Sequence, residues 1–165
     1  MLPLMSGSME GKDMKKKVLV PLDSSKLAEC AISHVKDLAK YGIVGEVTLL
    51  NVVPQAYAPL EEGYKANVTL LAARDENLAA SRRYLAALEA SLNAEGIEVK
   101  TASVEAINVA GAITEYAQNN GMDMIVIATH GYTGLKKMLL GSVASGVVQQ
   151  SNVAVYLIRP DACSV

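Results

Sequence analysis

The chain has 165 residues, of which 51% are hydrophobic and 19% charged, and its formal net charge is −2. These proportions fit one soluble globular domain and exclude a disordered protein. The near-neutral charge provides no basic surface for nucleic acid or for an anionic membrane. No apolar run approaches the roughly 20 residues of a membrane span. Because Trp and Phe are absent, the core must be built mainly from aliphatic side chains and Met.

The N-terminal segment and the two cysteines bear on processing and location. Residues 1–14 are expected to be a disordered extension or an added remnant, and they lack the apolar run of a signal peptide. Cys30 and Cys163 lie far apart and outside any CxxC pair, so neither a disulfide framework nor a zinc site is predicted, and a cytoplasmic location is expected. The helical spacing of Cys30 with apolar neighbours favours a small buried side chain over a nucleophile.

The first half of the chain alternates strand and helix patterns. A β-branched run over 17–22 predicts a strand, and three-four periodicity over 26–41 predicts an amphipathic helix. The apolar run over 46–53 predicts a second strand, buried on both faces. Residues 55–66 show no period and are expected to form a loop or lid. The Ala- and Leu-rich stretch over 70–93 then predicts one long helix.

The second half repeats this alternation. Strands are predicted over 97–104, 122–128 and 153–158, and helices over 109–119 and 141–150. Five strands alternating with four helices are typical of α/β proteins. We therefore predict an open, mainly parallel five-stranded sheet with helices on both faces and the strand order 3-2-1-4-5.

This strand order predicts where a ligand would bind. In doubly wound sheets the ligand lies beyond the carboxyl ends of the strands, where the strand order reverses, here between the first and fourth strands. Residues 22–24 leave the first strand and residues 128–131 leave the fourth, before a glycine-containing loop that reaches Gly141 and Ser142. Glycines allow close backbone approach and a helix start attracts phosphate. Ser142 either adds a donor to that phosphate or simply caps the helix.

Three segments, KVLVPLDSS, THGYTGLKKMLLGSVASGVV and SNVAVYLIRP, resemble the universal stress protein A family. The resemblance spans residues 15–160, with a tail over 161–165. It implies a small Rossmann-like domain of the adenine nucleotide alpha hydrolase-like type, a cytoplasmic homodimer and, in one branch of the family, ATP binding. That branch carries the pattern Gly, two residues, Gly, nine residues, Gly, then Ser or Thr.

The pattern falls on Ala128, Gly131, Gly141 and Ser142. Three of these four positions match, and Ala128 stands where a glycine is expected. The alanine methyl lies where backbone and nucleotide would approach closely.

Further binding residues are implied by the same resemblance. Asp23 corresponds to the acidic residue that faces adenosine, although it could equally cap the following helix. Val52 corresponds to an aliphatic residue beside adenine, and Pro21 and Leu22 would line the same pocket. Ile107 stands where many ATP-binding members have glycine, and it would either crowd the adenine or pack on it.

Two residues of the glycine-containing loop complete the predicted site. Thr133 either reaches a phosphate or is solvated, and His130 is expected near phosphate or solvent. A catalytic role for His130 is disfavoured because no partner for acid–base chemistry can be proposed from the spacing.

Assembly is predicted through the last strand, over 153–159. An exposed apolar sheet edge invites pairing with another chain, and family members pair this strand in a two-fold dimer. Val153, Val155 and Leu157 are the residues to test. The alternative is that the N-terminal extension covers this edge.

Three functions are compatible with these residues. The first is a dimeric regulatory protein of the stress response that binds ATP or AMP, with Mg²⁺ accompanying a triphosphate. The second is a module of the non-nucleotide branch that acts through protein partners, its pocket blocked near Ile107 and Ala128. The third is an enzyme acting on phosphate esters or anhydrides, for which at most slow ATP hydrolysis is expected because no convincing base or metal cluster is present.

Overall fold

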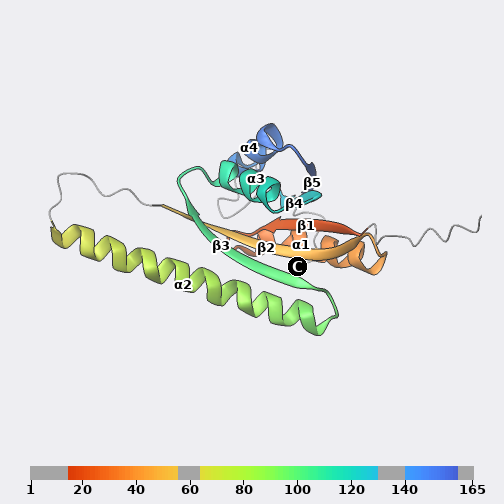
Figure 1. The fold of residues 1–165 in the computed structure, drawn as a ribbon, viewed down its shortest axis with the longest axis horizontal. Coiled ribbons are helices and arrows are strands. Elements are labelled where there is room, and N and C mark those ends of the chain that lie inside the picture. The colour runs from red at the N-terminus through yellow and green to blue at the C-terminus, as the bar shows by residue number, and fades with distance from the viewer. Residues whose placement is uncertain (1–14, 56–63, 130–139, 160–165) are drawn as a thin grey trace, which may run out of the picture.

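A single parallel sheet organises the chain (Figure 1). The structure is a computed structural model that describes residues 15–55, 64–129 and 140–159. The strands are β1 (Lys16–Pro21), β2 (Val44–Pro54), β3 (Val99–Ala106), β4 (Met124–Ala128) and β5 (Ala154–Ile158). Their order is β3-β2-β1-β4-β5 and every pairing is parallel. The predicted α/β class and strand order are confirmed.

Helices cover both faces of this sheet. They are α1 (Lys26–Lys40), α2 (Tyr64–Ala94), α3 (Val109–Asn119) and α4 (Ser142–Gln150). One apolar cluster joins α1 and α2 to one face, and a second joins α3 and α4 to the other. Figure 1 shows α3 and α4 across the sheet from the long α2.

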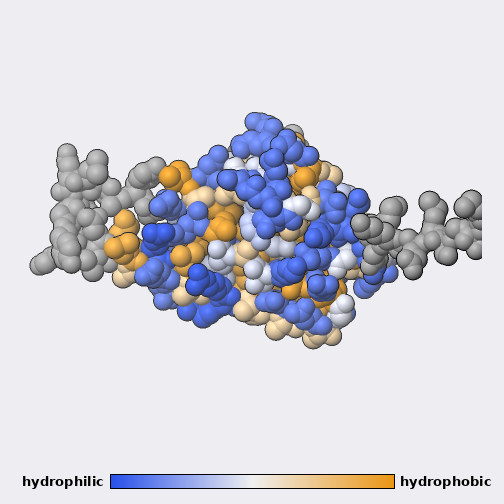
Figure 2. Space-filling view, in the orientation of Figure 1, coloured by the Kyte–Doolittle hydropathy of each residue, from blue (hydrophilic) through white to orange (hydrophobic). Residues whose placement is uncertain are grey.

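The strand β1 shows how the sequence produces this two-sided core. Val18 and Val20 belong to the cluster under α1 and α2, whereas Leu19 belongs to the cluster under α3 and α4, and all three are fully buried. Successive side chains of a strand point to opposite faces, so a continuous apolar run is what a sheet covered on both sides requires. Apolar groups on the visible surface are correspondingly scattered among hydrophilic ones (Figure 2).

Several element boundaries differ from the prediction by one or more residues, and the starts of α2 and β3 are two of them. The helix α2 begins at Tyr64 rather than near 70. Residues 64–66 of the predicted loop are therefore helical, and residues 56–63 lie outside the described residues. The strand β3 begins at Val99 rather than 97, because Ile97 still belongs to the turn that ends α2. The Ile97 N–H donates to the Leu92 carbonyl at 3.2 Å, and Gly96 adopts a φ of 81° that a residue with a side chain rarely takes.

Cys30 is buried in the core, as its spacing predicts. It is disulfide-bonded rather than a free thiol, which the cysteine spacing did not predict. Cys163, the N-terminal segment 1–14 and the tail after 159 lie outside the described residues. In the part of the chain that the structure describes, no helix is both long and apolar enough to span a membrane.

Candidate functional site

A cavity of about 220 Å³ lies at the carboxyl ends of β1, β2 and β4. Since β1 and β4 are the neighbours at which the strand order reverses, this is the switch point where doubly wound sheets bind ligands. Most of the lining is aliphatic, with polar groups from the ends of β1 and β4 and the start of α4. The lining residues are Pro21, Leu22, Asp23, Ala28, Leu50, Val52, Val109, Ile113, Ile127, Ala128, Thr129, Gly141, Ser142, Val143 and Ala144.

The exit of β1 is held to β2 beyond the last strand residue. The Leu22 N–H donates to the Leu50 carbonyl at 2.8 Å, and the side-chain amide of Asn51 donates to the Leu22 carbonyl at 2.7 Å. Both backbone polar groups of Leu22 are therefore fixed by β2, and the direction in which the chain leaves the sheet is set there.

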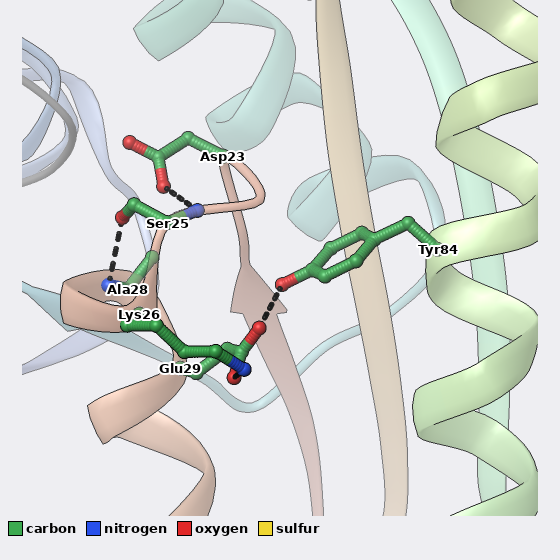
Figure 3. Close-up of polar contacts among 6 residues, drawn as sticks. All are labelled: Asp23, Ser25, Lys26, Ala28, Glu29 and Tyr84. Carbon is green, nitrogen blue, oxygen red and sulfur yellow. Dashed lines mark hydrogen bonds and ion pairs between the residues drawn. The ribbon is translucent and has the colours of Figure 1, made fainter. Parts of the chain in front are cut away.

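Asp23 follows in a tight turn that leads into α1 (Figure 3). Its carboxylate accepts a hydrogen bond from the Ser25 N–H at 3.0 Å, and Ser24 adopts a φ of 66°, in the left-handed region. The Ser25 hydroxyl, not Asp23, caps α1 by accepting from the Ala28 N–H at 3.1 Å. Asp23 thus stabilises the turn while lining the cavity, and the expectation that it caps the helix itself is wrong.

The exit of β4 brings together motif positions that are distant in sequence. Ala128 is buried and lines the cavity. Next to it, the Thr129 N–H donates to the Ile158 carbonyl at 2.8 Å, and the Thr129 carbonyl accepts from the Gly141 N–H at 2.6 Å. This contact places the start of α4 beside the end of β4, so that Ala128, Gly141 and Ser142 meet at one cavity.

The start of α4 presents backbone donors. Gly141 is the N-cap residue and supplies no capping side chain, and its carbonyl accepts from the Ser145 N–H at 2.8 Å. The first amides of the helix, from Ser142 to Ala144, lie in residues that line the cavity. Such amides and the helix dipole favour an anion. The interpretation of Ser142 as the helix cap is wrong, because it is the first helical residue.

The structure does not bring every predicted residue to the cavity. Ile107 is 61% exposed and is absent from the lining, so in this structure it neither crowds nor packs on a ligand there. His130, Gly131 and Thr133 lie outside the described residues.

Several lining residues were missed by the sequence analysis. Val109 and Ile113 are one helical turn apart on α3, and their periodicity could have placed them toward the sheet. Val143 is the neighbour of the predicted Ser142, whereas Thr129 belongs to the residues predicted to leave the fourth strand at the switch point. No sequence pattern signals that Leu50 faces the cavity, because the pairs Leu49–Leu50 and Val52–Val53 place apolar residues on both faces of β2.

The chemistry of the described lining is that of binding. Asp23 is the one ionisable residue among the lining residues. Within the described ranges, no three His, Cys, Asp or Glu side chains are grouped to hold a metal ion. The cavity therefore combines aliphatic walls, one carboxylate and a helix start, an arrangement suited to a ligand with an apolar ring and an anionic end.

These features define a doubly wound α/β domain with a ligand crevice at its topological switch point. The family model of the universal stress protein family matches residues 14–159. The chain belongs to this family.

Two curated relatives come from Methanocaldococcus jannaschii. Universal stress protein MJ0577 is 30% identical over 157 residues, which covers 88% of this chain and 96% of that protein. Universal stress protein MJ0531 is 28% identical over 151 residues, covering 90% of this chain and 85% of that protein.

Solved structures share the fold. The MJ0577 structure aligns with a TM-score of 0.75 at 30% identity, over 88% of this chain and 96% of that one. A universal stress protein of Arabidopsis thaliana with AMP bound aligns with a TM-score of 0.63 at 17% identity, over 89% of this chain and 93% of that one. At that identity the likeness supports the fold alone.

Proposed function

We propose that this universal stress protein binds an adenine nucleotide, ATP or AMP, and acts as a dimeric regulatory protein. The observation that carries the proposal is the switch-point cavity, which is lined both by Asp23 and by the start of α4. A solved structure of the same fold with AMP bound supports the view that this architecture can accept such a ligand.

Each part of a nucleotide has a counterpart in the lining. Aliphatic walls that include Val52 and Ile113 bury the flat base without aromatic stacking. The Asp23 carboxylate accepts hydrogen bonds from donor groups of the nucleoside. The amides of the first turn of α4 and the Ser142 hydroxyl donate to phosphate. With one carboxylate in the described lining, Mg²⁺ would be held chiefly by the phosphates of ATP.

A second function is favoured by Ala128. This residue lines the cavity where ATP-binding members of the family have glycine. If its methyl prevents close approach of the nucleotide, the protein acts instead through protein partners with the cavity empty. The two functions differ in one observable, which is binding of nucleotide by the purified protein.

Dimerisation through β5 is the second part of the proposal. β5 is last in the strand order, and in the described residues its outer edge pairs with no other strand. Tyr156 and Leu157 are exposed there, whereas Val153 and Val155 pack partly against the core under α3 and α4. Leu157 is therefore a better probe of the edge than the two valines.

Thermal unfolding with ligands tests nucleotide binding. ATP and AMP at about 100 times the dissociation constant should add about 2.7 kcal/mol of stability, which corresponds to a Tm rise of roughly 5–10 °C. Adenosine alone and phosphate alone should each give a smaller rise, because each fills one part of the site. GTP is the matched control for the base. The absence of any rise with millimolar ATP and AMP would overturn the proposal in favour of the partner-binding function.

A further inference from the structure

A chain of hydrogen bonds between polar side chains links α2 to the exit of β1. The Ser103 and Ser81 hydroxyls lie 2.7 Å apart, the Ser81 hydroxyl donates to the Asn51 side-chain oxygen at 2.8 Å, and the Asn51 amide donates to the Leu22 carbonyl at 2.7 Å. Asn51 is 6% exposed and Ser81 is 5% exposed. The hydrogen-bonded side chains therefore cross the core from β3, through α2 and β2, to the end of β1.

The number of donor protons fixes the direction of these hydrogen bonds. A serine hydroxyl has one proton, and Ser81 gives its proton to Asn51. Ser103 must therefore donate to Ser81. The Ser81 proton in turn identifies the oxygen of the Asn51 amide, which leaves its NH₂ group facing Leu22. Every group in the chain has a partner, which is the condition for burying polar side chains without a large cost.

A second contact from α2 reaches the other side of the same turn. Tyr84 follows Ser81 by three residues and so lies on the same face of α2. Its hydroxyl donates to the Glu29 carboxylate in the first turn of α1 at 3.2 Å (Figure 3). α2 is thus connected to Leu22, just before Asp23, and to Glu29, just after the turn.

The turn between these two contacts is the part of the site whose backbone conformation must be stabilised. It contains Ser24 in the left-handed region, which costs free energy in a residue other than glycine. It also carries Asp23 on the cavity wall. The side chain of Val52, which follows Asn51, lines the same cavity.

We infer that Asn51 is a positioning residue: by holding the Leu22 carbonyl it sets the place of Asp23, and through Ser81 it couples α2 to the nucleotide site. This inference rests on the proposed function for the identity of the ligand. The coupling is reciprocal, so a ligand that fixes Asp23 also stabilises the contact of α2 with Asn51.

Amide hydrogen exchange in the ligand-free protein tests the positioning role. Asn51→Leu removes the hydrogen bond to Leu22, and Ser81→Ala removes the group that orients the amide. Both variants should speed exchange of the Leu22 and Ser25 amides by about tenfold, the effect of losing roughly one buried hydrogen bond. Val47→Ala is the control, because Val47 is buried on the same strand and belongs to the core under α1 and α2. It lowers overall stability without touching the turn.

Calorimetric titration with AMP supplies the second readout. Asn51→Leu should weaken AMP binding about tenfold, whereas Val47→Ala should leave the dissociation constant unchanged, although both lower the Tm. The inference would be overturned if the Leu22 and Ser25 amides exchanged at the same rate in Asn51→Leu as in Val47→Ala. It would also be overturned if Asn51→Leu bound AMP with unchanged affinity. If the wild-type protein binds no AMP, the proposed function fails, and the exchange of the ligand-free protein still decides whether Asn51 positions the turn.

Discussion

The Tyr84 hydroxyl on α2 donates a hydrogen bond to the Glu29 carboxylate on α1 across 3.2 Å. Burial is the main reason that the pKa of Tyr84 lies well above its usual value, and the nearby charges of Glu29 and Asp23 raise this pKa further. Glu29 also pairs with Lys26 at 2.7 Å. The contact therefore joins α2 to the start of α1 at a point where the local charge opposes ionisation of the tyrosine.

The first prediction concerns the pH dependence of stability. Below pH 10 Tyr84 is protonated in both the folded and the unfolded chain, so its contribution to stability is fully present. Above pH 10.0, the usual value, the unfolded chain releases this proton while the folded chain keeps it. The free energy of unfolding must therefore fall as the pH rises through this window. Denaturant unfolding between pH 9 and 11.5 should show a shallower fall in Tyr84→Phe than in the wild type.

The same variant has a small expected cost at neutral pH. Tyr84→Phe should lose about 0.5–1 kcal/mol, because Glu29 keeps its partner Lys26. Tyr41→Phe is the matched control, since Tyr41 is 81% exposed, and it should leave the pH dependence unchanged. Identical slopes for the wild type and Tyr84→Phe would contradict the account of this contact.

The second prediction concerns Ser24. Because its φ of 66° penalises a side chain, Ser24→Gly should stabilise the protein by about 0.5–1 kcal/mol in chemical denaturation. Ser33→Gly, in the middle of α1, is the matched control and should destabilise by about 1 kcal/mol. A loss of stability in Ser24→Gly would mean that the hydroxyl, rather than the backbone conformation, matters in the turn.

The third prediction concerns Ala128. If its methyl obstructs the nucleotide, Ala128→Gly should tighten AMP binding about threefold, which is roughly 0.6 kcal/mol, while lowering the Tm of the free protein. Ala102→Gly on β3 makes the same chemical change outside the cavity lining, and it should lower the Tm with no change in affinity. Weaker binding by Ala128→Gly would show that the methyl contributes to the site instead of blocking it.

The fourth prediction concerns assembly. Leu157 is 39% exposed on the sheet edge, and a lysine there is a common obstacle to edge pairing. Light scattering should find a dimer for the wild type and a monomer for Leu157→Lys. Leu71→Lys, on the exposed part of α2, should remain dimeric. A monomeric wild type, or a dimeric Leu157→Lys, would remove β5 as the interface.

The sequence predicts more of the fold than of the site. Apolar patterns in the sequence predicted the nine elements of the described residues, because these elements contribute apolar side chains to the two core clusters. The predicted start of α2 was about six residues too late, and residues 71–77 of this helix are exposed and bury no apolar face. Which residues line the cavity depends on backbone direction at the ends of strands, and periodicity does not encode that direction.

Particular residues illustrate this limit. Ile107 and Val109 are two positions apart, yet only Val109 lines the cavity, because Asn108 caps α3 between them by accepting from the Gly111 N–H at 3.0 Å. No sequence pattern predicted a role for Asn51, which stands among apolar residues of β2. Its role depends on Ser81 and Leu22, which are brought to it by tertiary structure.

The most direct test of the central claim is calorimetric titration of the wild type and Val52→Phe with AMP. Val52 lines the cavity and is not fully buried, so the larger ring can occupy the space of the base. Ile43→Phe adds the same ring at an exposed position before β2. We predict one AMP site per chain in the wild type and in Ile43→Phe, with binding at least about tenfold weaker in Val52→Phe. Undetectable binding by the wild type, or equal binding by Val52→Phe, would contradict the assignment of this cavity to a nucleotide.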